Sequence, residues 1–98
     1  MAMHIGVLQF TVEIPYAASL KDKRRVTKSM KDKLRRIYNV SIAETDNQDE
    51  ATLATMGVAA ASSDVKQVNS LLDRLLNTLH DWRDASLTDH QIEIFRPH

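Results

Sequence analysis

Basic residues are concentrated in one stretch, Ser19 to Tyr38, where the chemistry they offer is the binding of anions. The stretch reads SLKDKRRVTKSMKDKLRRIY; its nine Lys or Arg and two Asp residues give a net charge of +7. The rest of the chain holds four basic and eleven acidic residues, a net charge of −7, so the formal total of zero conceals a strong separation of charge. This separation favours attraction to a polyanion or to an acidic protein surface.

The same stretch predicts one amphipathic helix that would position these cations. Ser19 is a favoured N-cap, and Asp22 stands three residues later, as in a capping box. At 100° per residue, one side of the helix is mostly apolar and is formed by Leu20, Val26, Thr27, Met30, Leu34, Ile37 and Tyr38. The other side spans an arc of roughly 140° along about 29 Å of helix. Its cations are Lys21, Arg24, Arg25, Lys28, Lys31, Arg35 and Arg36.

This row of cations suits contacts with successive phosphates of a nucleic acid, where each neutralised phosphate releases a counterion. We therefore predict that the partner is RNA. Little sequence preference and no DNA sequence specificity are expected, because phosphate contacts carry no base information. A solvated outer helix face is the other interpretation of the same pattern, and it stays open.

Lys23 is different, because it falls in the middle of the apolar side of the predicted helix. An ammonium in that place must reach the edge of the core or find a carboxylate. The parity of the next predicted strand points Glu44 toward the helix, at the end of the sheet where the helix begins. We predict that Lys23 and Glu44 form a structural ion pair. A catalytic lysine is the weaker alternative.

Hydrophobic alternation predicts four strands, at residues 4–14, 40–45, 52–61 and 88–95. A second amphipathic helix is expected from residue 65 to about Trp82, with its core face formed by Val65, Val68, Leu71, Leu72, Leu75, Leu76, Leu79 and Trp82. The order strand–helix–strand–strand–helix–strand predicts one ferredoxin-like α+β domain over residues 1–98. It is a two-layer sandwich with an antiparallel sheet in the order 4-1-3-2 and both helices on one face.

The other face of this sheet is expected to be open and partly apolar near Ile5 and Val7. Such a face favours a homodimer or another protein partner. Stacking of RNA bases, as in RRM domains, is not expected there, because the two central strands place no aromatic side chain on it. A phosphate-binding loop of the acylphosphatase kind is not expected either, because PYAAS after the first strand contains no glycine.

Several classes of protein are disfavoured by composition. The chain has no cysteine, so it has neither a disulfide nor a thiolate metal site. His4, His80, His90 and His98 lack ligand spacing, and the acidic turn Asp46–Glu50 lacks the pattern of a Ca²⁺-binding EF-hand loop. We therefore predict no metal and no cofactor. No apolar run approaches the roughly 20 residues that span a bilayer, and MAMHIGVLQF does not read as a signal peptide, so a cytoplasmic protein that binds no membrane is expected.

Five segments of the sequence together resemble the YlxP-like family of small bacterial proteins, a domain of unknown function. The segments are IGVLQFTVEIP, SLKDKRRVTKSMKDKLR, NVSIAETDNQD, MGVA and SSD, and SLKDKRR is the most specific. The resemblance implies the ferredoxin-like fold. It also implies a link to RNA or ribosome assembly, because genes of this family often lie beside those for ribosome-binding factor A and translation initiation factor two. The family has no established catalytic residues to carry over. A Trp-Gln-Arg-like stretch typical of it is replaced here by Ala51, Thr52 and Leu53.

The sequence thus predicts a non-catalytic RNA- or ribosome-associated binding module that acts through its first helix. A protein-interaction or homo-oligomerising module, acting through the open sheet face, is the alternative. An enzyme that uses Lys23 and Glu44 is the weaker one.

Overall fold

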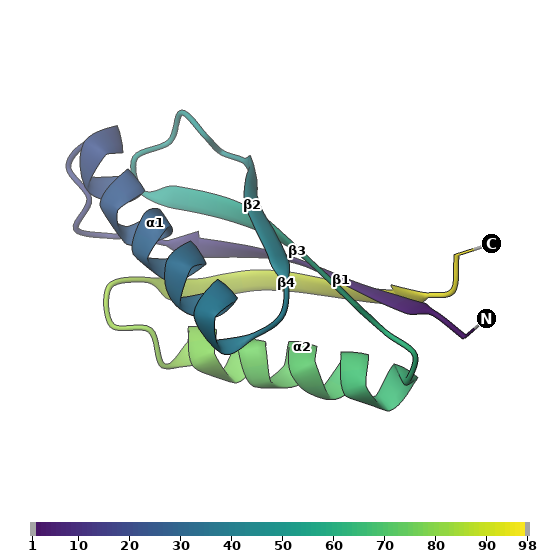
Figure 1. Ribbon diagram of the computed structural model, residues 1–98. Coiled ribbons are helices and arrows are strands. Elements are labelled where there is room, and N and C mark those ends of the chain that lie inside the picture. The colour runs from purple at the N-terminus through teal and green to yellow at the C-terminus, as the bar shows by residue number, and fades with distance from the viewer. Residues whose placement is uncertain (1, 98) are drawn as a thin grey trace.

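The strands and helices follow one another in the order that the sequence predicts in the computed structural model, which describes residues 2–97. Their bounds are β1 (His4–Glu13), α1 (Leu20–Ile37), β2 (Ser41–Asp46), β3 (Leu53–Ser62), α2 (Val65–His80) and β4 (Ser86–Phe95). All neighbouring strands are antiparallel, and their order across the sheet is β2-β3-β1-β4, the predicted order read from the opposite edge. Both helices lie on the same side of the sheet (Figure 1). The fold is therefore the expected ferredoxin-like α+β sandwich.

The core lies between the sheet and the two helices, with most of its helical side chains from α2 and with Met30 and Leu34 from α1. Alternate residues of β1 point into it, and Leu8, Phe10 and Val12 are all buried, together with Leu72 and Leu79 of α2. The helix lies so close to β1 that a Cβ added at Gly6 would collide with Val68 Cγ1. Any larger residue at this position would push α2 away from the sheet and overpack the core.

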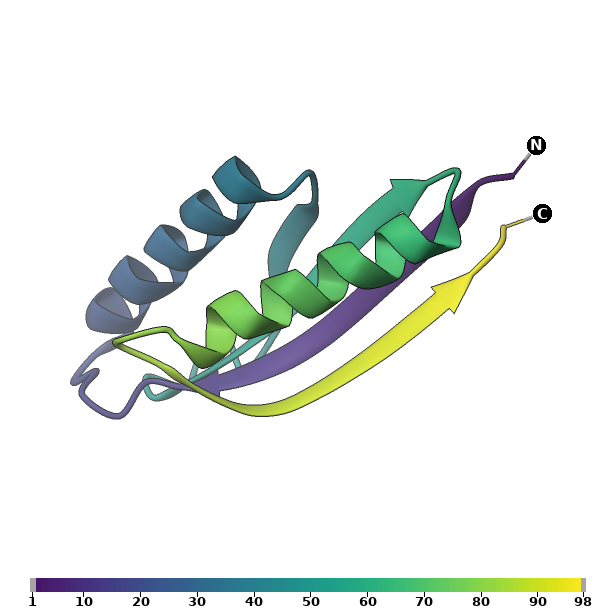
Figure 2. The ribbon, with the colours of Figure 1, turned by 90° about the horizontal axis from the view of Figure 1, so that it is seen from below.

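The two helices cover different parts of the sheet. α2 contacts β1, β3 and β4, whereas α1 packs against β2 at the other edge. Figure 2 shows the two helices separated along most of their length, with β4 forming the outer edge beyond α2. The Tyr38 hydroxyl joins the two helices, because it lies 3.0 Å from Arg74 O, to which it donates, and 2.8 Å from Thr78 Oγ1.

The fourth strand begins earlier than predicted. It starts at Ser86 and not at Thr88, because Leu87 pairs with Val12 and Ser86 pairs with Glu13 beyond a β-bulge. Since α2 also ends earlier than predicted, at His80 and not at about Trp82, the loop between them is shifted along the chain to residues 81–85. Ile37 and Val65, which the periodicity places on the apolar sides of their helices, do not lie in the core. Each sits at the end of a helix, where the side chain is exposed.

The first and last strands of the chain, β1 and β4, are antiparallel neighbours, so both described ends of the chain lie at one end of the molecule (Figure 1). In the part of the chain from residue 2 to residue 97, no helix combines the length and the apolar character needed to cross a membrane.

Candidate nucleic-acid interface

The first turn of α1 is fixed by local hydrogen bonds. Ser19 Oγ accepts from Asp22 N at 3.1 Å, and Asp22 Oδ2 accepts from Ala18 N at 3.0 Å. The bond to Ser19 Oγ satisfies a main-chain donor that a helix leaves free at its start, as the capping-box spacing predicts, whereas Asp22 reaches back to the residue before the N-cap and not to the N-cap itself. Since the helix starts at a defined residue, the angular position of every later side chain on α1 is defined as well.

The two sides of α1 meet different environments. Lys23, Thr27, Met30 and Leu34 are buried at helical spacing against the core. The predicted cations occupy the opposite side, where six of them are exposed and Lys31, at the flank, is half-buried. The structure thus places Lys21, Arg24, Arg25, Lys28, Lys31, Arg35 and Arg36 together on one outer surface, which we call the cationic face.

Asp32 engages two cations of this face. Lys28 Nζ lies 2.8 Å from Asp32 Oδ2, and Arg35 Nη1 lies 4.0 Å from Asp32 Oδ1. The hydrogen bond from Lys28 lowers the pKa of the Asp32 carboxyl, aided by the charges of Lys28, Arg35 and Lys31 and opposed by desolvation. Asp32 is therefore charged at neutral pH and offsets part of the local positive charge.

Arg35 has a second partner outside the helix. Its Nη2 donates to Ile42 O of β2 at 2.8 Å, so the guanidinium helps to hold α1 against the edge of the sheet. Lys33 is held too, because its Nζ lies 5.0 Å from the centre of the Trp82 ring, in cation–π geometry. Three exposed basic side chains of α1, namely Lys28, Lys33 and Arg35, thus already contact groups within the protein.

Five cations of the face make no ion pair or side-chain hydrogen bond with any part of residues 2–97. They are Lys21, Arg24, Arg25, Lys31 and Arg36. Arg25 and Arg36 also line a shallow depression of about 390 Å³ on the helix surface, together with Lys28, Ser29, Asp32 and Lys33. The face can therefore hold several anionic groups at once.

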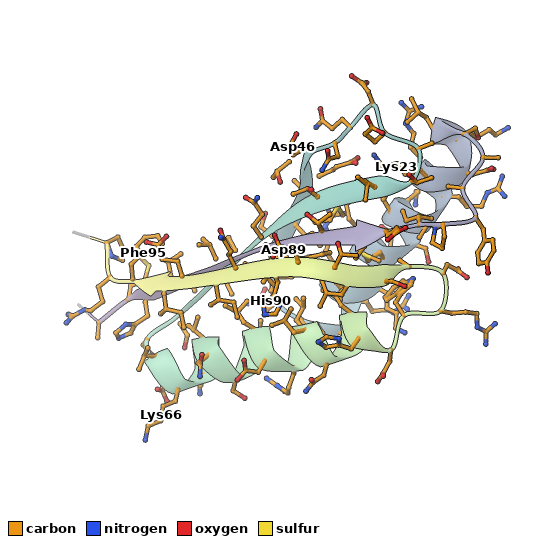
Figure 3. The ribbon with its side chains drawn as sticks, turned by 180° about the vertical axis from the view of Figure 1, so that it is seen from behind. Lys23, Asp46, Lys66, Asp89, His90 and Phe95 are labelled. Atoms are coloured by element: carbon orange, nitrogen blue, oxygen red, sulfur yellow. The ribbon has the colours of Figure 1, made fainter. Side chains whose placement is uncertain are left out.

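Lys23 and Glu44 are brought together at the other side of α1. Lys23 Nζ lies 2.8 Å from Glu44 Oε2, and the two side chains are 1% and 19% exposed. The ammonium also donates to Asn47 O at 2.6 Å. Figure 3 shows Lys23 at the end of the sheet where α1 begins. The pair fixes the first turn of the basic helix to the end of β2 and to the turn that follows.

Asn47 extends this contact across the sheet. Its backbone is left-handed, with φ of 58°, a conformation that Asn tolerates better than most residues. Its Nδ2 donates to Thr55 Oγ1 at 2.7 Å, and Thr55 Oγ1 lies 2.9 Å from Thr11 Oγ1. Thr55 is consequently buried although it lies on the open face. A chain of polar contacts thus joins α1 to the two central strands.

The Lys23–Glu44 pair is poorly placed for substrate chemistry. Lys23 is almost fully buried, and neither residue lines the main depressions on the surface of residues 2–97. Over the same residues, no three His, Asp or Glu side chains gather in a way that could hold a metal ion. His98 lies outside the described residues. This geometry favours a positioning role for the pair, with the cationic face as the candidate site.

Three contacts at the site were not anticipated from the sequence. The Lys28–Asp32 pair could have been predicted from the sequence, because residues four positions apart on a helix are neighbours on its surface. The Arg35–Ile42 and Lys33–Trp82 contacts join different elements, and nothing in the local pattern indicates them. These contacts reduce the number of cations that are free to bind a partner.

The fold and the site together define a ferredoxin-like sandwich that presents a cationic helix and an open sheet. The chain belongs to the family described as "Protein of unknown function (DUF503)", whose model matches residues 5–92. It is 33% identical over 91 residues to "Uncharacterized protein YlxP" of Bacillus subtilis (strain 168), covering 93% of this chain and 99% of the relative. Among solved structures it is similar to "De novo designed protein Foldit4", with a TM-score of 0.57, 13% identity, and 98% and 99% of the two chains covered. The likeness to that designed protein concerns the fold alone.

Proposed function

We propose that this protein binds the phosphate backbone of RNA, within a ribosomal subunit or free, through the cationic face of α1. The observation that carries the proposal is the set of five cations without a partner in residues 2–97. They lie on the outer side of an 18-residue helix about 27 Å long. Cations that no internal carboxylate neutralises are available to phosphates along a strand.

Contacts at both ends of α1 hold the cationic face in a fixed position. The buried Lys23–Glu44 pair and the Arg35–Ile42 contact fix the helix to the sheet from opposite ends. Since the helix is held in place, its main chain needs no further ordering when the cations meet a row of phosphates, and the entropic cost of binding is limited to their side chains. The chemistry is recognition of charge, so low sequence preference is expected.

A salt series tests this proposal. Binding of the protein to single-stranded RNA and to ribosomal subunits is measured by filter retention and co-sedimentation at increasing salt. Five phosphate contacts predict a slope of log affinity against log salt of about −3.5, since each contact contributes roughly −0.7 for a single strand. The variant Arg24→Gln, Arg25→Gln, Arg36→Gln should lower the magnitude of this slope by about 2.

A matched variant removes three cations from elsewhere in the molecule. Lys66→Gln, Arg74→Gln, Arg83→Gln changes the net charge equally but leaves α1 intact. Circular dichroism confirms that both variants are folded. RNA binding that is absent at low salt, or that both variants weaken equally, would refute the proposal for α1.

Homo-oligomerisation through the open sheet face is the second candidate. A depression of about 820 Å³ on that face favours it, since small and apolar residues such as Val7, Gly57 and Ala59 line it beside the polar Gln9 and Gln91 and the carboxylate of Glu93. Analytical ultracentrifugation of the wild type and of Val7→Glu tests it. A dimer that Val7→Glu dissociates supports this candidate, and a monomer at all concentrations contradicts it.

A further inference from the structure

The two edges of the sheet differ in how well they are protected. β2, at one edge, has six residues, contacts α1, and already has its Ile42 carbonyl engaged by Arg35. β4, at the other edge, has ten residues and pairs with β1 along one side only. Within residues 2–97, no side chain donates to a main-chain carbonyl of Ser86–Phe95, and no strand lies beyond them (Figure 2).

A long edge strand of this kind is a template for the main chain of another segment. Soluble proteins commonly block such an edge with charged side chains, above all Lys, with Pro, with a β-bulge or with a covering element. The sequence of β4, SLTDHQIEIF, contains neither Lys nor Pro, and its β-bulge lies near its first residues, at Thr88, so residues 89–95 keep a regular edge whose charges are the carboxylates of Asp89 and Glu93. α2 covers part of one face of β4 and leaves its outer edge free (Figure 2).

The charge of the strands shows what kind of segment would fit. The four strands contain five carboxylates and no Lys or Arg. Glu44 is engaged by Lys23, but Asp89 and Glu93 of β4 are exposed and make no ion pair within residues 2–97. Both lie on the open side of the sheet with Gln91 between them, as their pairing with Thr11 and Val7 shows.

The two faces of β4 have different chemistry. Figure 3 shows Asp89 and His90 on opposite sides of the strand. Ile92, which shares the side of His90, is 37% exposed beside the uncovered edge. A strand added next to β4 would therefore meet carboxylates on one face and apolar surface on the other.

We propose that β4 binds an extended segment of another protein chain in which Lys or Arg alternates with apolar residues. The segment adds to the sheet as a fifth strand. Its main chain pairs with the free edge of β4, its basic side chains lie opposite Asp89 and Glu93, and its apolar side chains cover Ile92. This inference is independent of RNA binding, because it uses the edge of the sheet that lies farthest from α1.

A second copy of β4 fits this edge less well. Antiparallel pairing centred on Gln91 would place Asp89 of each copy directly opposite Glu93 of the other. Like charges in that position destabilise a pair of strands. RNA is unsuited to the edge for the same electrostatic reason.

Binding of a short synthetic peptide of alternating valine and lysine, with blocked ends, tests the proposal. Affinity is measured by isothermal titration calorimetry at constant salt, and amide hydrogen exchange is followed by NMR. The wild type is compared with Asp89→Asn, Glu93→Gln. The control variant Asp49→Asn, Glu50→Gln also removes two exposed carboxylates, but from the turn between β2 and β3 at the opposite edge of the sheet.

We expect saturable binding that slows amide exchange within residues 86–95. Two cross-strand charge pairs predict roughly tenfold weaker binding by Asp89→Asn, Glu93→Gln and little change in the control variant. Equal weakening in both variants would overturn the proposal, and so would slowed exchange confined to residues outside β4. If the protein without peptide is already a dimer and its amides 86–95 are protected from exchange, then the edge of β4 binds a second copy of the chain, and the proposal is overturned.

Discussion

Lys23 and Lys28 lie five positions apart on the same helix, and the ammonium of each is 2.8 Å from a carboxylate oxygen. The distances are equal, but the surroundings are not. The Lys23 and Glu44 side chains are 1% and 19% exposed, whereas those of Lys28 and Asp32 are 77% and 51% exposed. An exposed ion pair contributes little to stability, because each charged group is hydrated equally well without its partner. When one member of a buried ion pair is removed, the other is left as an uncompensated charge away from water, which is strongly destabilising. The same contact is thus structural in one place and nearly neutral in the other.

The largest effect is expected from removing the buried ammonium. Lys23→Ala should lower the free energy of unfolding by about 3 kcal/mol, because Glu44 loses its counterion and Asn47 O loses its donor. Urea denaturation followed by circular dichroism measures this. In Lys23→Met, Glu44→Leu the uncompensated charge is gone, so most of the loss should be recovered. A Lys23→Ala protein as stable as Lys28→Ala would contradict the comparison.

A smaller effect is expected at the turn that the buried pair holds. Asn47→Ala should cost about 1–2 kcal/mol, because it removes the hydrogen bond to Thr55 and places a less tolerant residue at φ of 58°. Asn47→Gly loses the same hydrogen bond without backbone strain, so it should cost less than Asn47→Ala. Equilibrium unfolding of both variants gives the difference. A Gly variant less stable than the Ala variant would show that strain has no part in this turn.

On the cationic face of α1, the engaged Lys28 can be compared with Arg24, unpaired within residues 2–97, through RNA binding. Arg24→Ala should reduce the magnitude of the salt slope by about 0.7, as expected for one lost phosphate contact. Lys28→Ala should reduce it less, because Lys28 is already engaged by Asp32. The salt dependence of RNA binding by both variants checks this. A larger effect of Lys28→Ala would show that Asp32 does not withhold the ammonium from phosphate.

The smallest effect on stability is expected from Asp32→Asn. Its carboxyl has a lowered pKa in the folded protein, so any stability it adds is present above the ordinary value of 3.8 and is lost as the pH falls through the lowered pKa. We expect no measurable change in stability at neutral pH, because the carboxylate is solvated. NMR titration gives a direct measurement instead. In Lys28→Ala the pKa of Asp32 should rise toward 3.8, and an unchanged pKa would contradict the assigned cause.

Local chemistry explains what the sequence predicted well. Ser19 and Asp22 define the start of α1 within four residues of chain, and the helical period separates the cations from Met30 and Leu34. The alternation in β1 gives its core face, so the order of the six elements and the strand order follow from ordinary connection rules. The ion pair between Lys23 and Glu44 could be predicted from the alternation of side chains along the second strand and from the order of the elements alone.

The features that were not predicted depend on residues far apart in the sequence. Ser86 and Leu87 join β4 because Glu13 and Val12 are there to pair with them. Thr55 is buried because the left-handed Asn47 reaches across to it. Arg35 finds the carbonyl of Ile42 only once α1 lies against β2. Each of these contacts joins two elements, and the local pattern of one element carries no information about the other.

The pairing of β1 with β4 has a consequence for how the chain folds. Ile5 is matched with Phe95, which is separated from it by almost the whole sequence, and the other neighbour of β1 is the distant β3. Sheets built from such non-local pairs close large loops before they gain contacts, so they fold slowly. During synthesis, β1 emerges first and must wait, unpaired, for the strands on either side of it. The segment from Ile5 to Val12, which is rich in apolar residues, is therefore the part of a growing polypeptide that is most prone to aggregate with other chains.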